Sequence, residues 1–174
     1  SPFSSMPVMA SDDMVSQLEE VMKEPDIDAV IFRVNSGGGS ALASDLIWRA
    51  VERVQTEKPI VVTMSDAAAS GGYYVSCGAD KVFAQPGTLT GSIGILTAHI
   101  SMGRLLDKIG VTADIIHVGE YKSAMEIFTH TEPSEEAAEN IEWLFDGVYE
   151  SLVGMIAESR GIPSEEVRAL IDEG

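Results

Sequence analysis

Two kinds of apolar pattern alternate along the chain. In one, apolar residues recur every three or four positions, as on one face of a helix; in the other, they form short continuous runs. The first pattern predicts helices that begin at Ser11-Asp12-Asp13 and at Ala43, a short helix over SGGYYVSCGA, helices over residues 101–109 and 134–159, and a last helix after Pro163. The second predicts strands over residues 29–34, 59–64, 81–84, 95–99 and 111–118, with SDAAA and PGTLTGSIG as turns.

This order of elements indicates an α/β protein. Strands that alternate with helices at this spacing are typical of βαβ units, whose right-handed crossovers place the strands in parallel. No internal repeat or low-complexity linker divides the chain. We therefore expect a single domain over residues 1–174, with a parallel sheet and a long helix near its C-terminal end.

The long helix carries an apolar stripe. We interpret the stripe as core packing rather than as a partner-binding face, because burial is the commoner reason for such spacing. The stripe consists of Ile141, Leu144, Phe145, Val148, Leu152, Met155 and Ile156.

Composition narrows the class of protein. With 28 acidic and 11 basic residues, the chain has a formal net charge of −17, which disfavours nucleic acid and anionic membrane surfaces as direct partners. The single cysteine, Cys77, can form neither an internal disulfide nor a metal cluster and is expected to be a buried packing residue. No apolar run is long enough to span a bilayer, and the first residues do not resemble a signal peptide.

Two unusual loops follow the first two predicted strands. NSGGGS and SDAAASGG should lie at the same edge of the sheet, because the carboxyl ends of parallel strands meet there. Ser70, between three alanines and two glycines, is either a nucleophile or the N-cap of an ordinary helix. If it is a nucleophile, the backbone amides of Gly39 and Gly71 are the candidates to stabilise the oxyanion of an acyl transfer.

Nucleotide binding is the competing use of a glycine-rich loop. NSGGGSAL lacks the third glycine of G-x-G-x-x-G, and G-x-x-x-x-G-K-[ST] does not occur. Nor does Ser70 lie in G-x-S-x-G, because position 68 is Ala68. Phosphate binding and the α/β-hydrolase arrangement are therefore disfavoured.

A nucleophilic serine needs a base, and histidine is one option. A Ser-His-Asp triad would use His99, His117 or His130 with an acid such as Asp114. His99 and His117 fall within predicted strands, where a hydrogen-bonded structural histidine is the commoner state. The triad remains open as an alternative to a lysine base.

Lys122 is the candidate lysine, because GEYKSAMEIF places it in a loop after a predicted strand, with apolar neighbours that exclude water. A lysine accepts a proton only as the neutral amine, so local desolvation must outweigh the acidic excess of the chain. Glu120 and Glu126 are accordingly expected to point away from the amine. Ser92, in TGSIG, is the candidate to hold the amine in place.

Four motifs occur in one order along the chain: NSGGGS, AASGGYY, DKVFAQPGTLTGSIGI and GEYKSAMEIF. By these motifs the chain resembles, from about residue 28 to its end, the single-domain type of the signal peptide peptidase A family of serine proteases. This family lies within the Clp-protease/crotonase superfold. The resemblance implies an α/β fold of repeated ββα and βαβ units, with a parallel sheet and a long C-terminal helix.

The resemblance also implies roles for individual residues. Ser70 is the nucleophile, Lys122 is the general base, and Ser92 orients the lysine. Gly39 and Gly71 form the oxyanion hole, and neither a metal nor a cofactor is expected.

Members of this family degrade signal peptides left in the membrane and cleave unfolded polypeptides. They assemble into rings in which neighbouring subunits supply the serine and lysine of one site, so this chain is expected to be inactive as a monomer. The resemblance implies a membrane-associated parent protein with a soluble protease domain on the extracytoplasmic side. The chain is expected to be a trimmed or processed part of it, without the membrane anchor and the terminal segments.

One residue departs from the family pattern. Gly37 occupies the position at which the family usually has proline, giving N-S-G-G-G in place of N-S-P-G-G. Because proline fixes a backbone dihedral, the oxyanion loop is expected to be looser here until substrate or a neighbouring subunit orders it.

The leading hypothesis is a serine endopeptidase with a Ser-Lys dyad that degrades cleaved signal peptides and unfolded apolar polypeptides. Two alternatives are kept. One is a Clp-like protease with a Ser-His-Asp triad. The other is a catalytically inactive, ring-forming scaffold or peptide-binding module that has kept the motif residues.

Overall fold

The structure is a computed structural model that describes residues 8–96, 100–119 and 122–173. The chain divides into two compact units. One comprises Ser1–Gly94 with Val153–Gly174, and the other comprises Ile95–Leu152. Helix α6 (Glu135–Arg160) contributes residues to both units.

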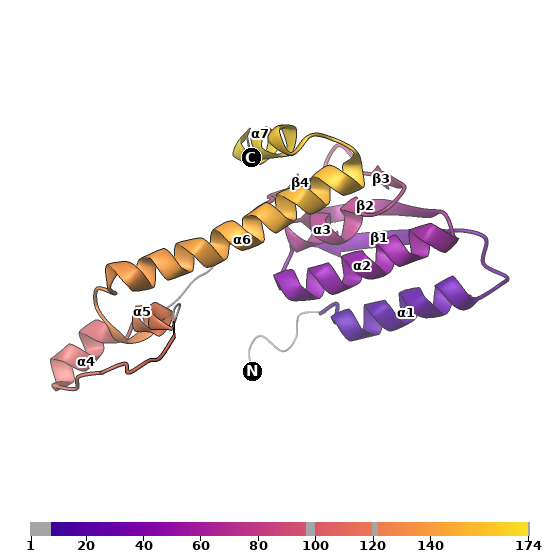
Figure 1. The fold of residues 1–174 in the computed structure, drawn as a ribbon. Coiled ribbons are helices and arrows are strands. Elements are labelled where there is room, and N and C mark those ends of the chain that lie inside the picture. Colours follow the sequence, from indigo (N-terminus) through magenta and orange to yellow (C-terminus); the bar gives the residue numbers. More distant parts are fainter. Residues whose placement is uncertain (1–7, 97–99, 120–121, 174) are drawn as a thin grey trace. The chain divides into compact units, whose positions relative to one another are not determined.

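A parallel sheet is the framework of the first unit (Figure 1). Its central strand, β2 (Ile60–Ala69), pairs along one edge with β1 (Val30–Ser36) and along the other with β3 (Lys81–Phe83) and β4 (Leu89–Gly91). All three pairings are parallel. This confirms the α/β fold class that the alternation of helices and strands predicted.

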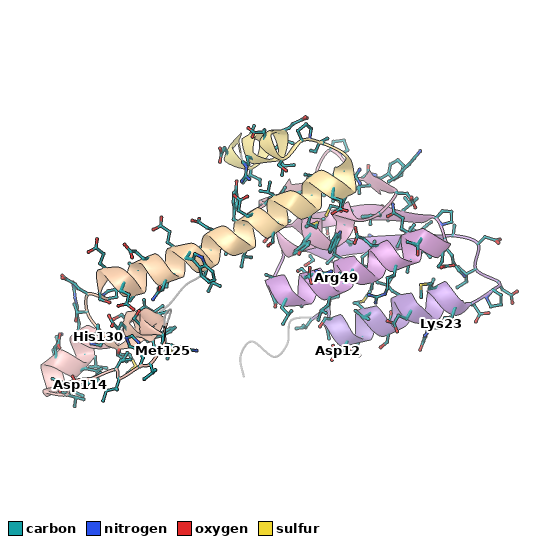
Figure 2. The ribbon with its side chains drawn as sticks, in the orientation of Figure 1. Asp12, Lys23, Arg49, Asp114, Met125 and His130 are labelled. Atoms are coloured by element: carbon teal, nitrogen blue, oxygen red, sulfur yellow. The ribbon has the colours of Figure 1, made fainter. Side chains whose placement is uncertain are left out.

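Three helices of this unit pack in sequence. α1 (Ser11–Lys23) contacts α2 (Ala41–Glu57), and α2 contacts α3 (Gly71–Cys77). α1 and α2 lie side by side in Figure 1, and Figure 2 shows Asp12 and Lys23 at opposite ends of α1. An acid in the first turn and a base in the last turn both complement the helix dipole, as the predicted helix start required.

The core lies between these helices and the sheet. In β1 and the first part of β2, alternate side chains are buried, as expected for strands with one packed face. Ile31, on the opposite face of β1, is 77% exposed. The buried cluster consists of Leu18, Phe32, Val34, Ile47, Ala50, Val51, Val54, Ile60, Val62, Met64, Ala68, Val75 and Ala79.

β2 is longer than its apolar run indicates. The prediction of a turn over SDAAA is wrong, because Ala67–Ala69 continue the strand by pairing with Leu89–Gly91. The predicted turn PGTLTGSIG therefore contains β4. The register of β2 with β1 shifts after Met64, at the place where β2 changes its other neighbour from β3 to β4. A partner so far along the chain leaves no trace in the local pattern.

The C-terminal end of α6 and helix α7 (Ser164–Glu173) belong to the same unit. Arg160, on the last turn of α6, donates hydrogen bonds to the carbonyl oxygens of Cys77 (3.2 Å) and Ala79 (3.1 Å). Cys77 Sγ lies 3.2 Å from Met155 Sδ. The thiol is buried, which confirms the predicted packing role of this cysteine.

The second unit is small and helical. It contains, in chain order, α4 (Gly103–Ile109), the 3₁₀ helix η1 (Ser123–Met125), α5 (Glu126–Thr129) and the first part of α6. Gly103 lies against the backbone of His130 and Thr131, where a side chain would not fit. The hydroxyl of Thr131 donates to Asp107 Oδ2 at 3.0 Å, so α4 is held against the segment that follows α5.

Two predicted strands of this unit differ from the structure. Residues 111–118 form no strand and find no pairing partner within the described part of the chain, and Ile116 and Val118 are 95% and 94% exposed. Ile95 and Leu96, the described part of the predicted strand 95–99, also lie outside any strand. An apolar run predicts the conformation of a strand, but only a partner makes one.

The apolar stripe of α6 is buried only in part. Met155 and Ile156 are buried, whereas Leu144 and Val148 are 53% and 36% exposed. The prediction that the whole stripe packs in a core is therefore wrong for its middle section. None of the described helices combines the length and apolar character that crossing a membrane requires.

The close packing of α3 on β1 gives a test of the fold. A methyl group on Gly72 would lie 2.5 Å from the Ser36 carbonyl oxygen, so Gly72→Ala should lower the free energy of unfolding by about 1–3 kcal/mol in urea denaturation. Gly147→Ala in α6, where the added methyl meets nothing within 4 Å, should instead raise it by up to about 1 kcal/mol. Equal effects of the two substitutions would contradict this packing.

Candidate active site

Ser70 lies where β2 ends and the chain turns into α3. Its backbone has φ +52° and ψ −118°, a conformation that costs roughly 1–3 kcal/mol in a residue with a side chain. The turn is held by a hydrogen bond from Ser70 N to Gly91 O and one from Tyr74 N to Ser70 O, both 2.9 Å. The hydroxyl makes no capping hydrogen bond to α3, so this serine does not serve as an ordinary N-cap.

The glycine loop after β1 lies directly against this turn. At Gly38, where φ is +108°, a Cβ would lie 2.7 Å from Ser70 Cβ and 3.0 Å from Gly71 N. A Cβ on Gly71 would in turn lie 3.2 Å from Gly39 N. Glycine at position 38 thus permits both the positive φ and the close approach of the two segments. The NSGGGS loop and the turn at Ser70, which the sequence placed at one edge of the sheet, do meet there.

The backbone amides of Gly39 and Gly71 are left free at this contact. Gly71 is the first residue of α3, where a helix has no acceptor of its own for the N–H. Neither amide donates a hydrogen bond to any residue that the structure describes, whereas Gly38 N donates to Ser36 Oγ at 3.2 Å. Two free N–H donors beside a serine hydroxyl are the parts that oxyanion stabilisation needs.

Ser92 lies beside Ser70 because of the strand register. Ala69 of β2 pairs with Gly91 of β4, so the next residue of each strand emerges at the same edge. Ser92 is exposed and has φ +46°. Among the described residues other than glycine, positive φ occurs at Ser70 and Ser92 alone. The structure therefore brings two of the predicted site serines together.

Lys122 belongs to the second unit, so the predicted pair of Ser70 and Lys122 stays a prediction. Lys122 is exposed and directly precedes η1. The next residue, Ser123, is buried; its hydroxyl donates to Glu136 Oε1 at 3.2 Å and accepts from Asn140 Nδ2 at 2.7 Å. These bonds tie the backbone next to Lys122 to α6.

The acidic neighbours of Lys122 can be examined only in part. Glu126 Oε2 accepts a hydrogen bond from the backbone N–H of Ser134 at 2.9 Å, and this bond lowers the pKa of the Glu126 carboxyl. The carboxylate is thus engaged at the start of α6, where Ser134 Oγ also accepts from Ala137 N. Glu120 lies outside the described residues.

The histidines form no triad with an acid in the described part of the chain. Figure 2 labels Asp114, on the segment after α4, and His130, just after α5. His130 Nδ1 lies 3.0 Å from Thr129 Oγ1, and neither His117 nor His130 is hydrogen-bonded or ion-paired to a described Asp or Glu side chain. His99 lies outside the described residues.

Other chemistry finds less support in this region. Burial raises the pKa of the Cys77 thiol to about 12, so the thiolate that nucleophilic attack requires is scarce at neutral pH. The described residues contain no group of three or more His, Cys, Asp or Glu side chains that could hold a metal ion.

Sequence reasoning missed three residues beside the glycine loops. Asp45 and Tyr74 join α2 to α3 through a hydrogen bond of 3.0 Å, and Ser44 Oγ lies 2.5 Å from where a Cβ on Gly71 would be. The spacing of Asp45 and Arg49 is a readable i, i+4 pair. Nothing in the sequence indicates the contact of Asp45 with Tyr74, because it depends on how two helices pack.

Comparison with known proteins shows the family of the chain. The model of peptidase family S49 matches residues 52–173, which include Ser70, Ser92 and Lys122. The chain is 35% identical over 157 residues to "Serine protease SPPA, chloroplastic" of Arabidopsis thaliana, covering 90% of this chain and 23% of that protein. It is 43% identical over 110 residues to "Protease 4" of Haemophilus influenzae, covering 63% of this chain and 18% of that protein.

The chain thus spans less than a quarter of the length of either relative. Among solved structures it resembles a ClpP1 mutant from Listeria monocytogenes with a TM-score of 0.54 and 20% identity, covering 91% of this chain and 70% of that one. This likeness confirms the predicted Clp-protease type of fold, and the first relative confirms the resemblance to signal peptide peptidase A. Since the family model matches well over half of its length, the chain belongs to peptidase family S49.

Proposed function

We propose that the protein is a serine endopeptidase in which Ser70 is the nucleophile and Lys122 the general base. Ser92 orients the lysine, and the amides of Gly39 and Gly71 form the oxyanion hole. One observation carries the proposal: the strained turn at Ser70 lies against a glycine loop, with two amides free. Family membership supports the same reading, because the match includes Ser70 and Lys122.

The first half of the reaction makes an acyl-enzyme. The neutral amine of Lys122 takes the proton of Ser70 Oγ while Oγ bonds to the carbonyl carbon of the scissile peptide. The carbonyl oxygen becomes negative and accepts hydrogen bonds from Gly39 N and Gly71 N. When the C–N bond breaks, the lysine ammonium returns the proton to the leaving amine.

The second half releases the acyl group. Water gives its proton to the lysine and attacks the ester carbon, and the same two amides stabilise the second oxyanion. Collapse of this intermediate breaks the bond to Ser70 Oγ, which recovers its proton from the lysine. The chain needs neither a metal nor a cofactor for any of these steps.

The substrates we propose are extended apolar peptides, in particular cleaved signal peptides and unfolded polypeptides. The family resemblance and the description of one relative as a serine protease SPPA support this class. We further propose a ring of subunits that share their sites, a single protease domain, and a membrane-associated parent protein whose protease domain faces the extracytoplasmic side. The Clp-protease type of fold is compatible with such a ring.

The two alternatives have different consequences. A histidine triad would make activity independent of Lys122, and an inactive scaffold would leave Ser70 unreactive. The strained backbone at Ser70 argues against the scaffold, because such strain is retained mainly where function requires it.

Ser70→Ala should abolish peptide cleavage, with a fall of about 1000-fold or more, because the acyl-enzyme can no longer form. The measurement is mass spectrometry of a synthetic signal peptide and an unfolded protein after incubation. Ser151→Ala, which removes an exposed hydroxyl on α6, is the matched control and should cleave normally. Undiminished cleavage by Ser70→Ala would refute the assignment.

Lys122→Ala should likewise abolish cleavage, whereas Lys108→Ala, which removes a basic side chain from α4, should not. In the unsubstituted protein the rate should rise toward alkaline pH, because a lysine base works only as the neutral amine. The check is the pH profile of kcat/KM for all three proteins. Full activity of Lys122→Ala would instead favour a histidine base.

Gly37→Pro should stiffen the oxyanion loop. Gly37 is not among the residues with positive φ, a Cβ there meets nothing within 4 Å, and the preceding Ser36 is in a strand, as a residue before proline prefers. The free energy of unfolding should rise by about 0.4–1 kcal/mol, and kcat/KM should rise with it.

Gly38→Ala is the contrasting variant, because φ is +108° and the methyl would collide with Ser70 Cβ. It should lower both stability and kcat/KM. If Gly37→Pro is less stable than the unsubstituted chain, this loop conformation is incorrect.

A further inference from the structure

The two amides of the proposed oxyanion hole come from different elements. Gly39 lies in the loop that leads into α2, and Gly71 is the first residue of α3. Their spacing decides whether one oxyanion can accept from both, and misplacement by about 1 Å can cost two orders of magnitude in rate. Some contact must therefore set the position of α2 relative to α3.

The glycine loop between β1 and α2 does little by itself to fix the distance between the two amides. It includes three glycines, and its hydrogen bonds include one from Gly38 N to Ser36 Oγ at 3.2 Å, the capping bond from Ala43 N to Ser40 Oγ at 3.3 Å, and one from Ser44 N to Ser40 O at 3.0 Å. Ser44 Oγ donates to Ser40 O at 2.9 Å, one turn into α2. These bonds join the loop to α2, but none of them joins α2 to α3.

A side-chain hydrogen bond between α2 and α3 is made by Asp45 and Tyr74. The Tyr74 hydroxyl donates to Asp45 Oδ1 at 3.0 Å, and the backbone N–H of Tyr74 donates to Ser70 O at 2.9 Å. One residue thus contacts both the nucleophile turn and the helix that follows the oxyanion loop. The other oxygen of Asp45 accepts from Arg49 Nε at 2.8 Å, so both oxygens of the carboxylate are engaged.

Aromatic packing supports this bond. The Trp48 ring lies 6.1 Å from the Tyr74 ring at an interplanar angle of 37°, and the Arg49 guanidinium lies 5.5 Å from the centre of the Trp48 ring. Figure 2 shows Arg49 on α2. Burial, together with the bond to Asp45, raises the pKa of the Tyr74 hydroxyl above its ordinary value, so it remains a donor at the alkaline pH that a lysine base requires.

We propose that Asp45 and Tyr74 are a positioning pair that sets the spacing between the Gly39 and Gly71 amides. The inference rests on the proposed function and adds two residues to it. Neither residue touches the reacting atoms. Both act through the backbone, by fixing the start of α2 against the start of α3.

The variants follow from the geometry of the bond. Tyr74→Phe removes the donor, and Asp45→Ala removes the acceptor. Asp45→Asn keeps an oxygen that accepts from Tyr74 and is the conservative rescue. Tyr73→Phe makes the same chemical change one residue earlier, where the hydroxyl has no hydrogen bond to another residue in the described ranges, and is the matched control.

The first measurement does not depend on activity. In the ¹⁵N-labelled full chain, Tyr74→Phe and Asp45→Ala should shift or broaden the amide resonances of both Gly39 and Gly71. Tyr73→Phe and Asp45→Asn should leave the Gly39 resonance in place. A Gly39 amide that does not respond to loss of the Tyr74 hydroxyl overturns the proposal.

The second measurement is the rate at which a fluorophosphonate probe reacts with Ser70, together with kcat and KM for peptide cleavage. Tyr74→Phe and Asp45→Ala should each lower the probe rate and kcat about tenfold with little change in KM, and the double variant should be no slower than the slower single variant. Asp45→Asn and Tyr73→Phe should stay near the unsubstituted rate.

The outcomes separate the two claims. If the unsubstituted protein does not react at Ser70, the proposed function fails, and a catalytic role for the pair fails with it, whatever the resonances show. If the unsubstituted protein reacts and Tyr74→Phe reacts equally fast, only the positioning pair is refuted. An equal loss in Tyr73→Phe would likewise overturn the pair, because the effect would then reflect general destabilisation.

Discussion

The contact between the glycine loop and the turn at Ser70 is the constraint on which the site depends. Two backbone segments approach so closely that a Cβ on Gly38 would lie 2.7 Å from Ser70 Cβ. The Gly39 and Gly71 amides donate no hydrogen bond to a described residue at this contact, and Ser70 has a positive φ. Parallel pairing of β2 with both β1 and β4 holds this arrangement, because the two loops and Ser92 all leave the sheet at one edge.

Burial selects which groups near this contact can react. The Cys77 thiol is a potential competitor of Ser70, but burial raises its pKa to about 12 and it packs against Met155. The phenol of Tyr74 is likewise kept protonated by burial and by Asp45. The hydroxyl of Ser70 is only half-buried and has no capping bond, so it stays available. The local environment, rather than the formal charge of −17, decides this reactivity.

Much of the fold and of the site could be read from the sequence. Helices α1 and α2 follow from helical spacing and start signals, although α2 begins at Ala41 rather than at the predicted Ala43. The strand runs before NSGGGS and SDAAASGG place the glycine loop and Ser70 at one sheet edge. The end of β2 could not be predicted from the sequence, because its last residues belong to the strand only by pairing with Leu89–Gly91. The segment 111–118 has the apolar pattern of a strand and forms none, because no described partner pairs with it.

The sequence by itself determined the chemistry that is present: a serine among small residues, glycines that can approach another backbone, a lysine in the last of four ordered motifs, and one cysteine. These properties belong to single residues and their neighbours, so local reasoning reaches them. Only the tertiary structure decided that Ser92 emerges beside Ser70 and that Asp45 meets Tyr74. Both contacts join residues far apart in the chain, and their existence depends on strand register and helix packing, which local spacing does not encode.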